Sequence, residues 1–237
     1  MHRECSLGSG CEEPVSRSEA WRKEEGVLKK GLASLRLCAS AAQGLQFRAY
    51  SEELQKWNKA ASLVSKGDEK TLVTRQFLPS LALLEFIPGE DVRVADVGSG
   101  AGLPGIPLKI MRPELVLTLI ESRLKKALFL REVVERLSLS LVEILHRRAE
   151  EVESRYTVVL TRALGGLRYS LRICLPLVES EGTLILLRGS GAYAELKSAQ
   201  SWIERFGGEL TGVREVVFPL TEKHGTLVFI RKVSRET

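Results

Sequence analysis

The spacing of apolar residues along the chain changes character close to residue 91. From about 18 to 90, apolar side chains recur at steps of three to five residues, which predicts amphipathic helices. One stretch over 71–86 closes at Pro88-Gly89, and Pro79 inside it is expected to kink the helix. Residues 1–17 are polar and show no periodicity, so a disordered tail is predicted there. The longest apolar stripe consists of Leu45, Tyr50, Leu54, Trp57, Ala61 and Val64.

From Asp91 onward, short β-branched runs alternate with amphipathic stretches. This alternation predicts a parallel sheet covered by helices on both faces. The last two predicted strands, 210–218 and 226–231, are separated by too few residues for a crossover helix, so they should pair antiparallel. The other strands are predicted at residues 92–97, 115–120, 141–145, 157–160 and 183–187, with helices at 103–111, 124–137, 167–178 and 192–206.

The predicted fold class is therefore α/β, with a seven-stranded and mostly parallel sheet that closes in an antiparallel hairpin. This is the layout of class I S-adenosylmethionine-dependent methyltransferases, whereas an ordinary dinucleotide-binding fold would keep its final strands parallel. We divide the chain into a tail (1–17), an N-terminal helical segment (18–90) and a Rossmann-like domain (91–237).

A glycine-rich loop follows the first predicted strand, with glycines at 98, 100 and 102 that allow close approach of a ligand to the backbone. Asp96 ends that strand at the carboxyl edge of the sheet, where open α/β sheets bind ligands. A carboxylate there suits the ammonium group of a methionine moiety and would repel a pyrophosphate. The segment 100–105 also matches the GxGxxG pattern, so a nicotinamide cofactor stays open, although so short a match is weak. The acidic Asp96 and the predicted C-terminal hairpin favour S-adenosylmethionine over a nicotinamide cofactor.

Three further strand ends carry candidate residues. Glu121 ends the second strand, where both cofactor classes use an acid to accept hydrogen bonds from ribose hydroxyls, although a solvated glutamate would look the same in the sequence. Ala149 and Glu150 follow the third strand, beside the expected adenine, but Arg-Ala-Glu-Glu also suits the start of a helix. Arg162 follows the fourth strand, where groups face the transferred methyl, and an arginine among apolar neighbours is costly to bury without an anionic partner.

Charge and cysteine content add weaker constraints. The chain has 35 basic and 30 acidic residues, a net charge of +5 that suits RNA or an ordinary basic enzyme equally well. Its 4 cysteines lack the spacing of a metal knuckle or a disulfide framework, and we expect no metal. No apolar stretch approaches the ~20 residues that span a membrane, and no signal peptide is evident. We therefore expect a cytoplasmic protein, and charge alone assigns no function.

With these motifs in place, residues 27–232 resemble the bacterial RsmG family, also called GidB. The match centres on Asp96–Leu108, where the extension Leu103-Pro-Gly-Ile-Pro107 is more specific than the glycines. It continues through Leu119–Ser122, Lys125-Lys126, Phe129-Leu130, Arg148–Glu151, Thr161–Ala163 and, upstream, Trp57-Asn58. The resemblance implies methylation of N7 of a guanine in 16S ribosomal RNA, either free or in the small ribosomal subunit. It also implies cofactor contacts at Gly98, Leu103, Ala149, Glu150 and Arg162.

The chain departs from the family before the glycine loop. Members usually carry Arg-His followed closely by Asp-Ser-Leu, and the matching stretch here reads Arg75-Gln-Phe-Leu-Pro79-Ser-Leu81. These positions would border the substrate side. The departure motivates a competing hypothesis, a non-catalytic RNA-binding module with a vestigial cofactor pocket. A methyltransferase of a small molecule or protein and a nicotinamide oxidoreductase stay open as well.

Guanine N7 offers a lone pair and no proton, so the implied reaction needs no general base. We therefore predict catalysis by positioning, with Arg162 as the catalytic candidate. It would bind guanine O6, a phosphate or the cofactor carboxylate, because pairing with N7 would block the nucleophile. We expect a monomer. The predicted RNA contacts are Arg75, Arg123, Lys125 and Lys126, and the predicted cofactor contacts are Asp96, Gly98, Ser99, Gly100, Gly102, Leu103, Glu121, Ala149, Glu150 and Arg162.

Overall fold

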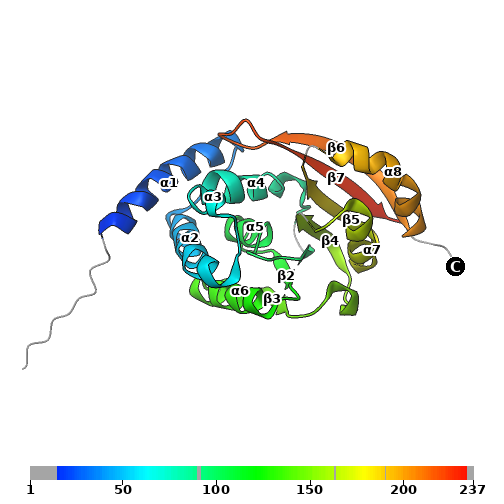
Figure 1. Cartoon of the computed structure of the whole chain (residues 1–237), viewed down its shortest axis with the longest axis horizontal. Helices are drawn as coiled ribbons and strands as arrows, with labels where there is room; N and C mark the ends of the chain where they lie inside the picture. The colour runs from blue at the N-terminus through cyan, green and yellow to red at the C-terminus, as the bar shows by residue number, and fades with distance from the viewer. Residues whose placement is uncertain (1–14, 90–91, 163, 190, 234–237) are drawn as a thin grey trace, which may run out of the picture.

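The computed structural model describes residues 15–89, 92–162, 164–189 and 191–233. Its centre is a seven-stranded sheet in the order β3-β2-β1-β4-β5-β7-β6 (Figure 1). Strands β1 to β5 are parallel, and β7 is antiparallel to both β5 and β6. The predicted fold class, including the antiparallel hairpin, is confirmed. The strands are β1 (Arg93–Val97), β2 (Val116–Ile120), β3 (Val142–Leu145), β4 (Tyr156–Arg162), β5 (Val178–Arg188), β6 (Gly208–Val217) and β7 (His224–Lys232).

Helices cover both faces of the sheet because successive side chains of each buried strand point to opposite faces. In β1, Val94 joins one hydrophobic cluster and Ala95 the other. The cluster on the first face contains residues of α5 (Gly105–Met111) and α6 (Leu124–Arg136). The cluster on the second face contains residues of α7 (Leu167–Cys174), the 3-10 turn η4 (Leu175–Leu177) and α8 (Ala192–Arg205). A further 3-10 turn, η3 (Ala149–Glu151), follows β3.

The N-terminal segment is helical, as predicted, but its boundaries differ. Helix α1 begins at Val15, so the predicted tail 1–17 is wrong for residues 15–17; residues 1–14 lie outside the described residues. The helix predicted over 71–86 is broken, because Pro79 lacks the N–H that a continuous helix requires. The elements are α1 (Val15–Ser34), α2 (Ala41–Ala61), α3 (Lys66–Glu69), the π-helical turn η1 (Val73–Phe77), α4 (Leu78–Leu81) and the 3-10 turn η2 (Leu84–Phe86).

These N-terminal helices share the first hydrophobic cluster with the sheet. Tyr50 of α2 stacks on Phe77 of η1, with ring centroids 5.1 Å apart, and both side chains are fully buried. Helix α2 also pairs with α6 through Glu53 and Arg136, and through Lys56 and Glu132. The division of the chain at residue 91 stays a prediction, and the shared cluster fixes the helical segment against the first face.

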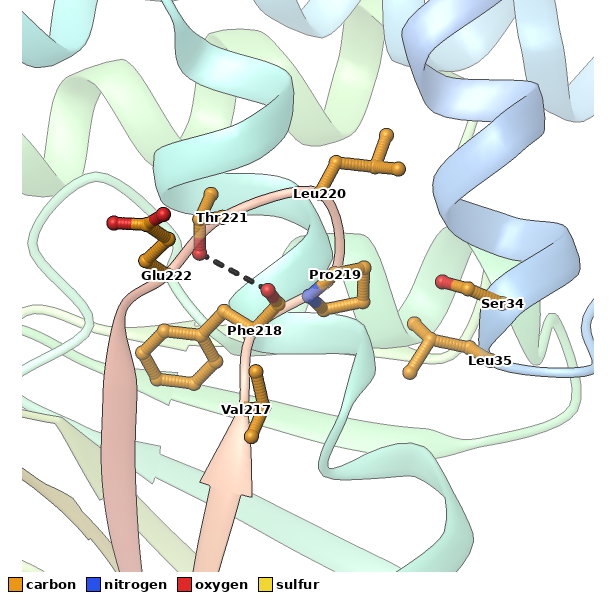
Figure 2. A pocket seen from close by; sticks show the side chains of 8 residues that line it. All are labelled: Ser34, Leu35, Val217, Phe218, Pro219, Leu220, Thr221 and Glu222. Carbon is orange, nitrogen blue, oxygen red and sulfur yellow. Dashed lines mark hydrogen bonds between the residues drawn. The ribbon is translucent and has the colours of Figure 1, made fainter.

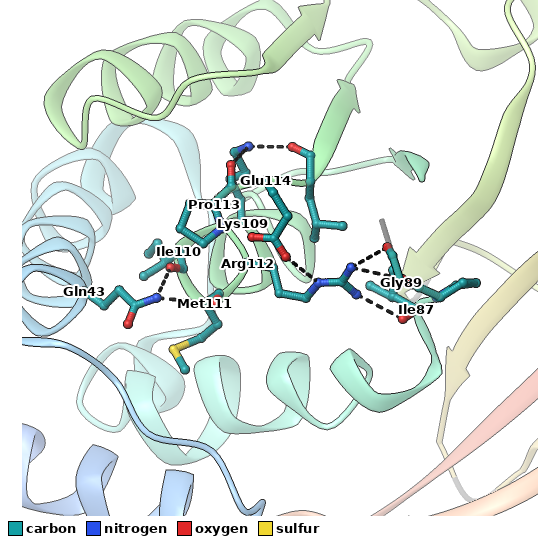
Figure 3. Close-up of polar contacts among 11 residues, drawn as sticks. Gln43, Ile87, Gly89, Lys109, Ile110, Met111, Arg112, Pro113 and Glu114 are labelled. Atoms are coloured by element: carbon teal, nitrogen blue, oxygen red, sulfur yellow. Dashed lines mark hydrogen bonds and ion pairs between the residues drawn. The ribbon is translucent and has the colours of Figure 1, made fainter. Parts of the chain in front are cut away.

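The end of α5 remote from the glycine loop is held by side-chain bonds to main-chain carbonyls (Figure 3). Lys109 is buried and donates from Nζ to the carbonyls of Pro113, at 2.6 Å, and Leu115, at 2.5 Å. Arg112 donates to the carbonyls of Ile87, Pro88 and Gly89. These bonds tie the end of α5 to the segments 87–89 and 113–115 and so fix its position.

Within the described ranges, no helix is long and apolar enough to cross a membrane. The same residues contain no group of three or more His, Cys, Asp or Glu side chains arranged to hold a metal ion.

Candidate functional site

The glycine loop leaves β1 at the carboxyl edge of the sheet and turns in the left-handed region. Gly98, Gly100 and Gly102 have φ angles of 71°, 56° and 81°, which only glycine adopts without strain. The N–H groups of Gly98 and Ser99 donate to the carbonyl of Ile120 at the end of β2, at 2.9 and 3.2 Å. The loop is therefore held against the carboxyl end of the neighbouring strand.

Two of the predicted contacts have side chains directed into the protein. Ser99 is 2% exposed, and its hydroxyl donates to the carbonyl of Asp96 at 2.7 Å. Leu103 belongs to the first hydrophobic cluster. A Cβ at Gly102 would lie 2.6 Å from Cγ1 of Ile106, so this glycine permits close packing of the loop on α5. The side chains of Ser99 and Leu103, and the missing side chain of Gly102, shape the loop. For these three residues, the main-chain atoms are therefore the candidates for ligand contact.

The loop is also held by a residue that the sequence did not single out as part of the site. Tyr50 of α2 is fully buried and its hydroxyl donates to the carbonyl of Ala101 at 2.5 Å. The pKa of Tyr50 lies well above its ordinary value, mainly because of burial, so the hydroxyl keeps its proton and remains a donor. Helix α2 thus fixes the position of the glycine loop.

Asp96 is fully buried at the end of β1. Its Oδ2 accepts a hydrogen bond from the N–H of Gly105 at 3.0 Å, while Oδ1 is buried without a partner among the described residues. Burial raises the pKa of Asp96 to about 7; the nearby Glu121 raises it further, and the Gly105 N–H and Arg162 oppose the shift. A carboxyl group in this state is stabilised by any cationic or hydrogen-bond donating group placed against Oδ1.

Glu121 lies at the end of β2 and its carboxylate bridges two main-chain segments. Oε2 accepts from the N–H of Gly100 at 2.9 Å, and Oε1 accepts from the N–H of Arg123 at 2.7 Å. Each carboxylate oxygen can accept a second hydrogen bond. Glu121 can therefore hold the loop and the start of α6 and still accept from ribose hydroxyls.

A pocket lies between the ends of β1 and β2, the segment 147–150 and α7. Of the predicted cofactor residues, Gly98, Ala149 and Glu150 line it. The apolar and aromatic part of its wall was not predicted: Ile120 belongs to the motif around Glu121 but was not assigned a contact, and the others belong to no motif. These further lining residues include Ile120, Leu164, Tyr169 and Ile173. The other predicted cofactor residues lie outside the pocket lining: Asp96, Ser99, Gly100, Gly102, Leu103, Glu121 and Arg162.

Arg162 ends β4, and its guanidinium is partly buried. Nη2 donates to the main-chain carbonyl of Arg75 at 3.2 Å. Nη1 is buried and has no hydrogen-bond partner in the part of the chain that the structure describes. Burial lowers the pKa of Arg162, and interactions with Asp68, Tyr50 and Asp96 oppose this shift. The neighbouring Ala163, which belongs to the family motif, lies outside the described residues.

The four predicted RNA contacts fall in two places. Arg123 and Lys125 are exposed at the start of α6, and Lys126 reaches towards the loop, with Nζ 3.8 Å from the position of a Cβ at Gly100. Arg75 lies instead in η1, where its side chain pairs with Asp68 at 3.1 Å. The first three form a basic surface beside the glycine loop, while the charge of Arg75 is partly offset by its partner.

A second, open pocket lies between the end of α1 and the turn that joins β6 to β7 (Figure 2). It is lined by Ser34, Leu35 and residues 217–222, and none of the predicted site residues belongs to it. It carries no group that the expected chemistry uses.

Residues 43–225 match the family model of GidB, rRNA small subunit methyltransferase G. The ribosomal RNA small subunit methyltransferase G of Roseiflexus sp. (strain RS-1) is 41% identical over 195 residues, which cover 80% of this chain and 83% of that protein. The protein of the same name from Pelotomaculum thermopropionicum is 35% identical over 214 residues, which cover 87% and 90%. The nicotinamide hypothesis finds no support in these relatives.

Solved structures show the same fold at low sequence identity. M. jannaschii TYW2 in complex with AdoMet superposes with a TM-score of 0.53 at 16% identity, covering 73% of this chain and 78% of that chain. NSun6 from Pyrococcus horikoshii with SFG gives a TM-score of 0.54 at 15% identity, covering 68% and 53%. At these identities the likeness concerns the fold alone.

Proposed function

Because the chain belongs to the GidB family of rRNA small subunit methyltransferase G proteins, we propose that it transfers a methyl group from S-adenosylmethionine to N7 of a guanine in 16S ribosomal RNA. The observation that carries the proposal is the buried Asp96 carboxyl, with one oxygen unpartnered among the described residues, directly before the glycine loop. We propose further that the enzyme acts as a monomer in the cytoplasm, where its ribosomal substrate is.

The residues present fit this cofactor. Oδ1 of Asp96 would accept from the ammonium group of the methionine moiety, directly or through water, and Glu121 would accept from ribose hydroxyls. The apolar walls formed by Ile120 and Ile173 suit an adenine ring, beside Ala149 and Glu150. When bound, S-adenosylmethionine supplies an electrophilic methyl group on its sulfonium.

The chain's own contribution to the reaction is to bind and orient. Guanine N7 has a lone pair and carries no proton, so no side chain has to remove one. Arg162 presents the buried Nη1 without a partner in the described chain, and this cation would bind guanine O6, a phosphate or the cofactor carboxylate. Holding the two reactants in line accounts for most of the expected rate enhancement. Arg123, Lys125 and Lys126 would bind RNA phosphates beside the loop.

The proposal is tested with S-adenosylmethionine labelled in its methyl group. The protein is incubated with small ribosomal subunits, with free 16S RNA, and without RNA, and the RNA is counted after extraction. We expect label in at least one RNA sample. Cofactor binding without label in either RNA sample would instead favour a methyltransferase of another substrate or a non-catalytic RNA-binding module. Raising the salt concentration should weaken RNA binding, because phosphate contacts release counterions.

A comparison of Arg162→Ala with the unchanged protein shows whether Arg162 binds the RNA or the cofactor. Loss of methyl transfer with unchanged cofactor affinity would place Arg162 on the RNA side. Loss of cofactor affinity in calorimetric titration would place it on the carboxylate of the methionine moiety.

A further inference from the structure

The N-terminal helices contain a π-helical turn directly before a proline. The N–H of Leu78 donates to the carbonyl of Val73, five residues back, and Pro79 follows. In an α-helix the N–H of residue 79 would bond to the carbonyl of Arg75, but proline has no N–H. Pro79 therefore removes the α-helical donor for the Arg75 carbonyl. Single π-turns inside helical segments occur frequently at functional sites.

The Arg75 carbonyl accepts a hydrogen bond from Nη2 of Arg162, at 3.2 Å, across 87 residues of sequence. A carbonyl is neutral, so this bond fixes the direction of the guanidinium without neutralising its charge. The other terminal nitrogen, Nη1, is buried and lacks a partner in the described ranges. The guanidinium is thus held at one end, while the nitrogen at the other end has no acceptor among the described residues.

The π-turn that carries this carbonyl is itself fixed by side chains. The N–H of Val73 donates to the Glu24 carboxylate at 3.3 Å, and the Arg75 side chain donates to Asp68 at 3.1 Å. On the other side of the turn, the Ser80 hydroxyl donates to the carbonyl of Gln76 at 2.7 Å. Because the turn is bonded to α1 and to α3, its carbonyls keep their direction while Arg162 binds.

We infer that Pro79 is a positioning residue for the reaction: by withholding an N–H, it leaves the Arg75 carbonyl to Arg162 and so fixes the orientation of the guanidinium, whose Nη1 has no partner among the described residues. The inference rests on the proposed function for its effect on methyl transfer. The contact between the Arg75 carbonyl and Arg162 does not depend on that function and can be tested without it.

The first test is the variant Pro79→Ala, which supplies an N–H that can bond to the Arg75 carbonyl. The new N–H competes with Arg162 for the Arg75 carbonyl and draws that carbonyl into the helical bonding pattern. The bond from the guanidinium should therefore weaken, and we expect kcat/KM for methyl transfer to fall up to about tenfold, the effect of one hydrogen bond to a charged group. Thermal stability should be unchanged or higher, because alanine is the better residue inside a helix. Pro176→Ala is the matched control, since Pro176 is an exposed proline in the first turn of η4. Its activity should be unchanged.

The second test separates positioning from general damage to the helix. If Pro79 acts through Arg162, Pro79→Ala should cause no further loss in an Arg162→Ala background. Full activity of Pro79→Ala, or losses of the two variants that multiply, would overturn the inference. Should Pro79→Ala fold poorly, Pro79→Ser supplies the same N–H and replaces it in both measurements.

The third test detects the contact itself in the full-length protein. Arginine is labelled with ¹⁵N, and the Arg162 side-chain resonances are assigned from their absence in Arg162→Lys. Rotation of the guanidinium should be slow in the unchanged protein and in Pro176→Ala, and fast in Pro79→Ala. Equal rotation rates in all three proteins would overturn the inference. A protein that transfers no methyl group to RNA but passes this test would refute the proposed function and leave the contact intact.

Discussion

Replacing Asp96 with asparagine should abolish a loss of stability that the unchanged protein suffers as the pH rises, and should also remove the proposed cofactor contact. The folded chain holds Asp96 with a pKa of about 7, against an ordinary value of 3.8, mainly because the side chain is fully buried. Between these two values the folded protein keeps a proton that the unfolded chain releases. The free energy of unfolding therefore decreases as the pH rises through this window, and the loss is complete once the pH is well above the folded-state value.

The size of the effect follows from the two pKa values. A difference of about 3 pKa units, at about 1.4 kcal/mol per unit, corresponds to about 4 kcal/mol. Asparagine does not ionise, and it can accept from the Gly105 N–H as Asp96 does. About 3 kcal/mol of the total falls between about pH 5 and about pH 8.5, so the stability of Asp96→Asn relative to the unchanged protein should increase by that amount over this range.

Urea unfolding followed by circular dichroism at about pH 5 and about pH 8.5 measures this difference. Titrations shared by both proteins cancel in the comparison. Glu215→Gln removes an exposed carboxylate from β6 and serves as the matched control. A stability difference for Asp96→Asn that is the same at both pH values would refute the assignment of the proton to Asp96.

The same carboxyl should couple cofactor binding to proton release. If an ammonium group binds against Oδ1, the pKa of Asp96 falls, so binding at about pH 6, where the cofactor's amino group is already protonated, should release close to one proton. Calorimetric titration with S-adenosylmethionine in buffers of different ionisation enthalpy counts these protons. Asp96→Asn should bind weakly and release none. Binding by the unchanged protein without proton release at about pH 6 would contradict contact between the ammonium group and Asp96.

Three further substitutions test the surroundings of the loop. Tyr50→Phe leaves the Ala101 carbonyl without its donor; we expect a loss of about 1–2 kcal/mol in urea unfolding and weaker cofactor binding, and an unchanged affinity would refute a positioning role for the tyrosine. Gly98→Ala places a Cβ 2.8 Å from Leu164 at a φ of 71°. The variant should lose about 1 kcal/mol of stability, and its affinity for the cofactor should fall at least about tenfold. Lys109→Met removes the donor to two carbonyls and should cost about 2 kcal/mol without altering cofactor affinity, whereas an unchanged unfolding midpoint would show that solvent replaces the donor.

The sheet could be predicted from the sequence because its strands carry local signals. Buried runs of β-branched residues mark strands such as 92–97, and the short connection 219–225 leaves the antiparallel hairpin as the only suitable geometry. The N-terminal helices were predicted less accurately. Pro79 indicated that the helix over 71–86 would be disturbed, but the periodicity of apolar residues does not distinguish a kink from the π-turn over Val73–Phe77.

The site illustrates the same limit. Asp96 and the glycines were recognised because a strand, an acid and a glycine loop adjoin in sequence. The bond from Tyr50 to Ala101 joins residues far apart in the chain, and the acceptor of Arg162 is a main-chain carbonyl that any residue could supply. Contacts of this kind depend on tertiary packing and leave no pattern in a single sequence. A motif can also leave a side chain's partner undetermined. Ser99 was predicted to contact the cofactor from its place in the motif, but its hydroxyl donates to the carbonyl of Asp96.

The most direct test of the proposed reaction is to identify the methylated nucleoside. 16S RNA that lacks the modification is incubated with the protein and S-adenosylmethionine, digested to nucleosides, and analysed by mass spectrometry against a 7-methylguanosine standard, with Asp96→Asn as the control for cofactor binding. We expect the unchanged protein to form about one 7-methylguanosine per RNA molecule, and the variant to form much less. Methylation of any other nucleoside, or none in RNA despite proton-linked cofactor binding, would contradict the proposed reaction.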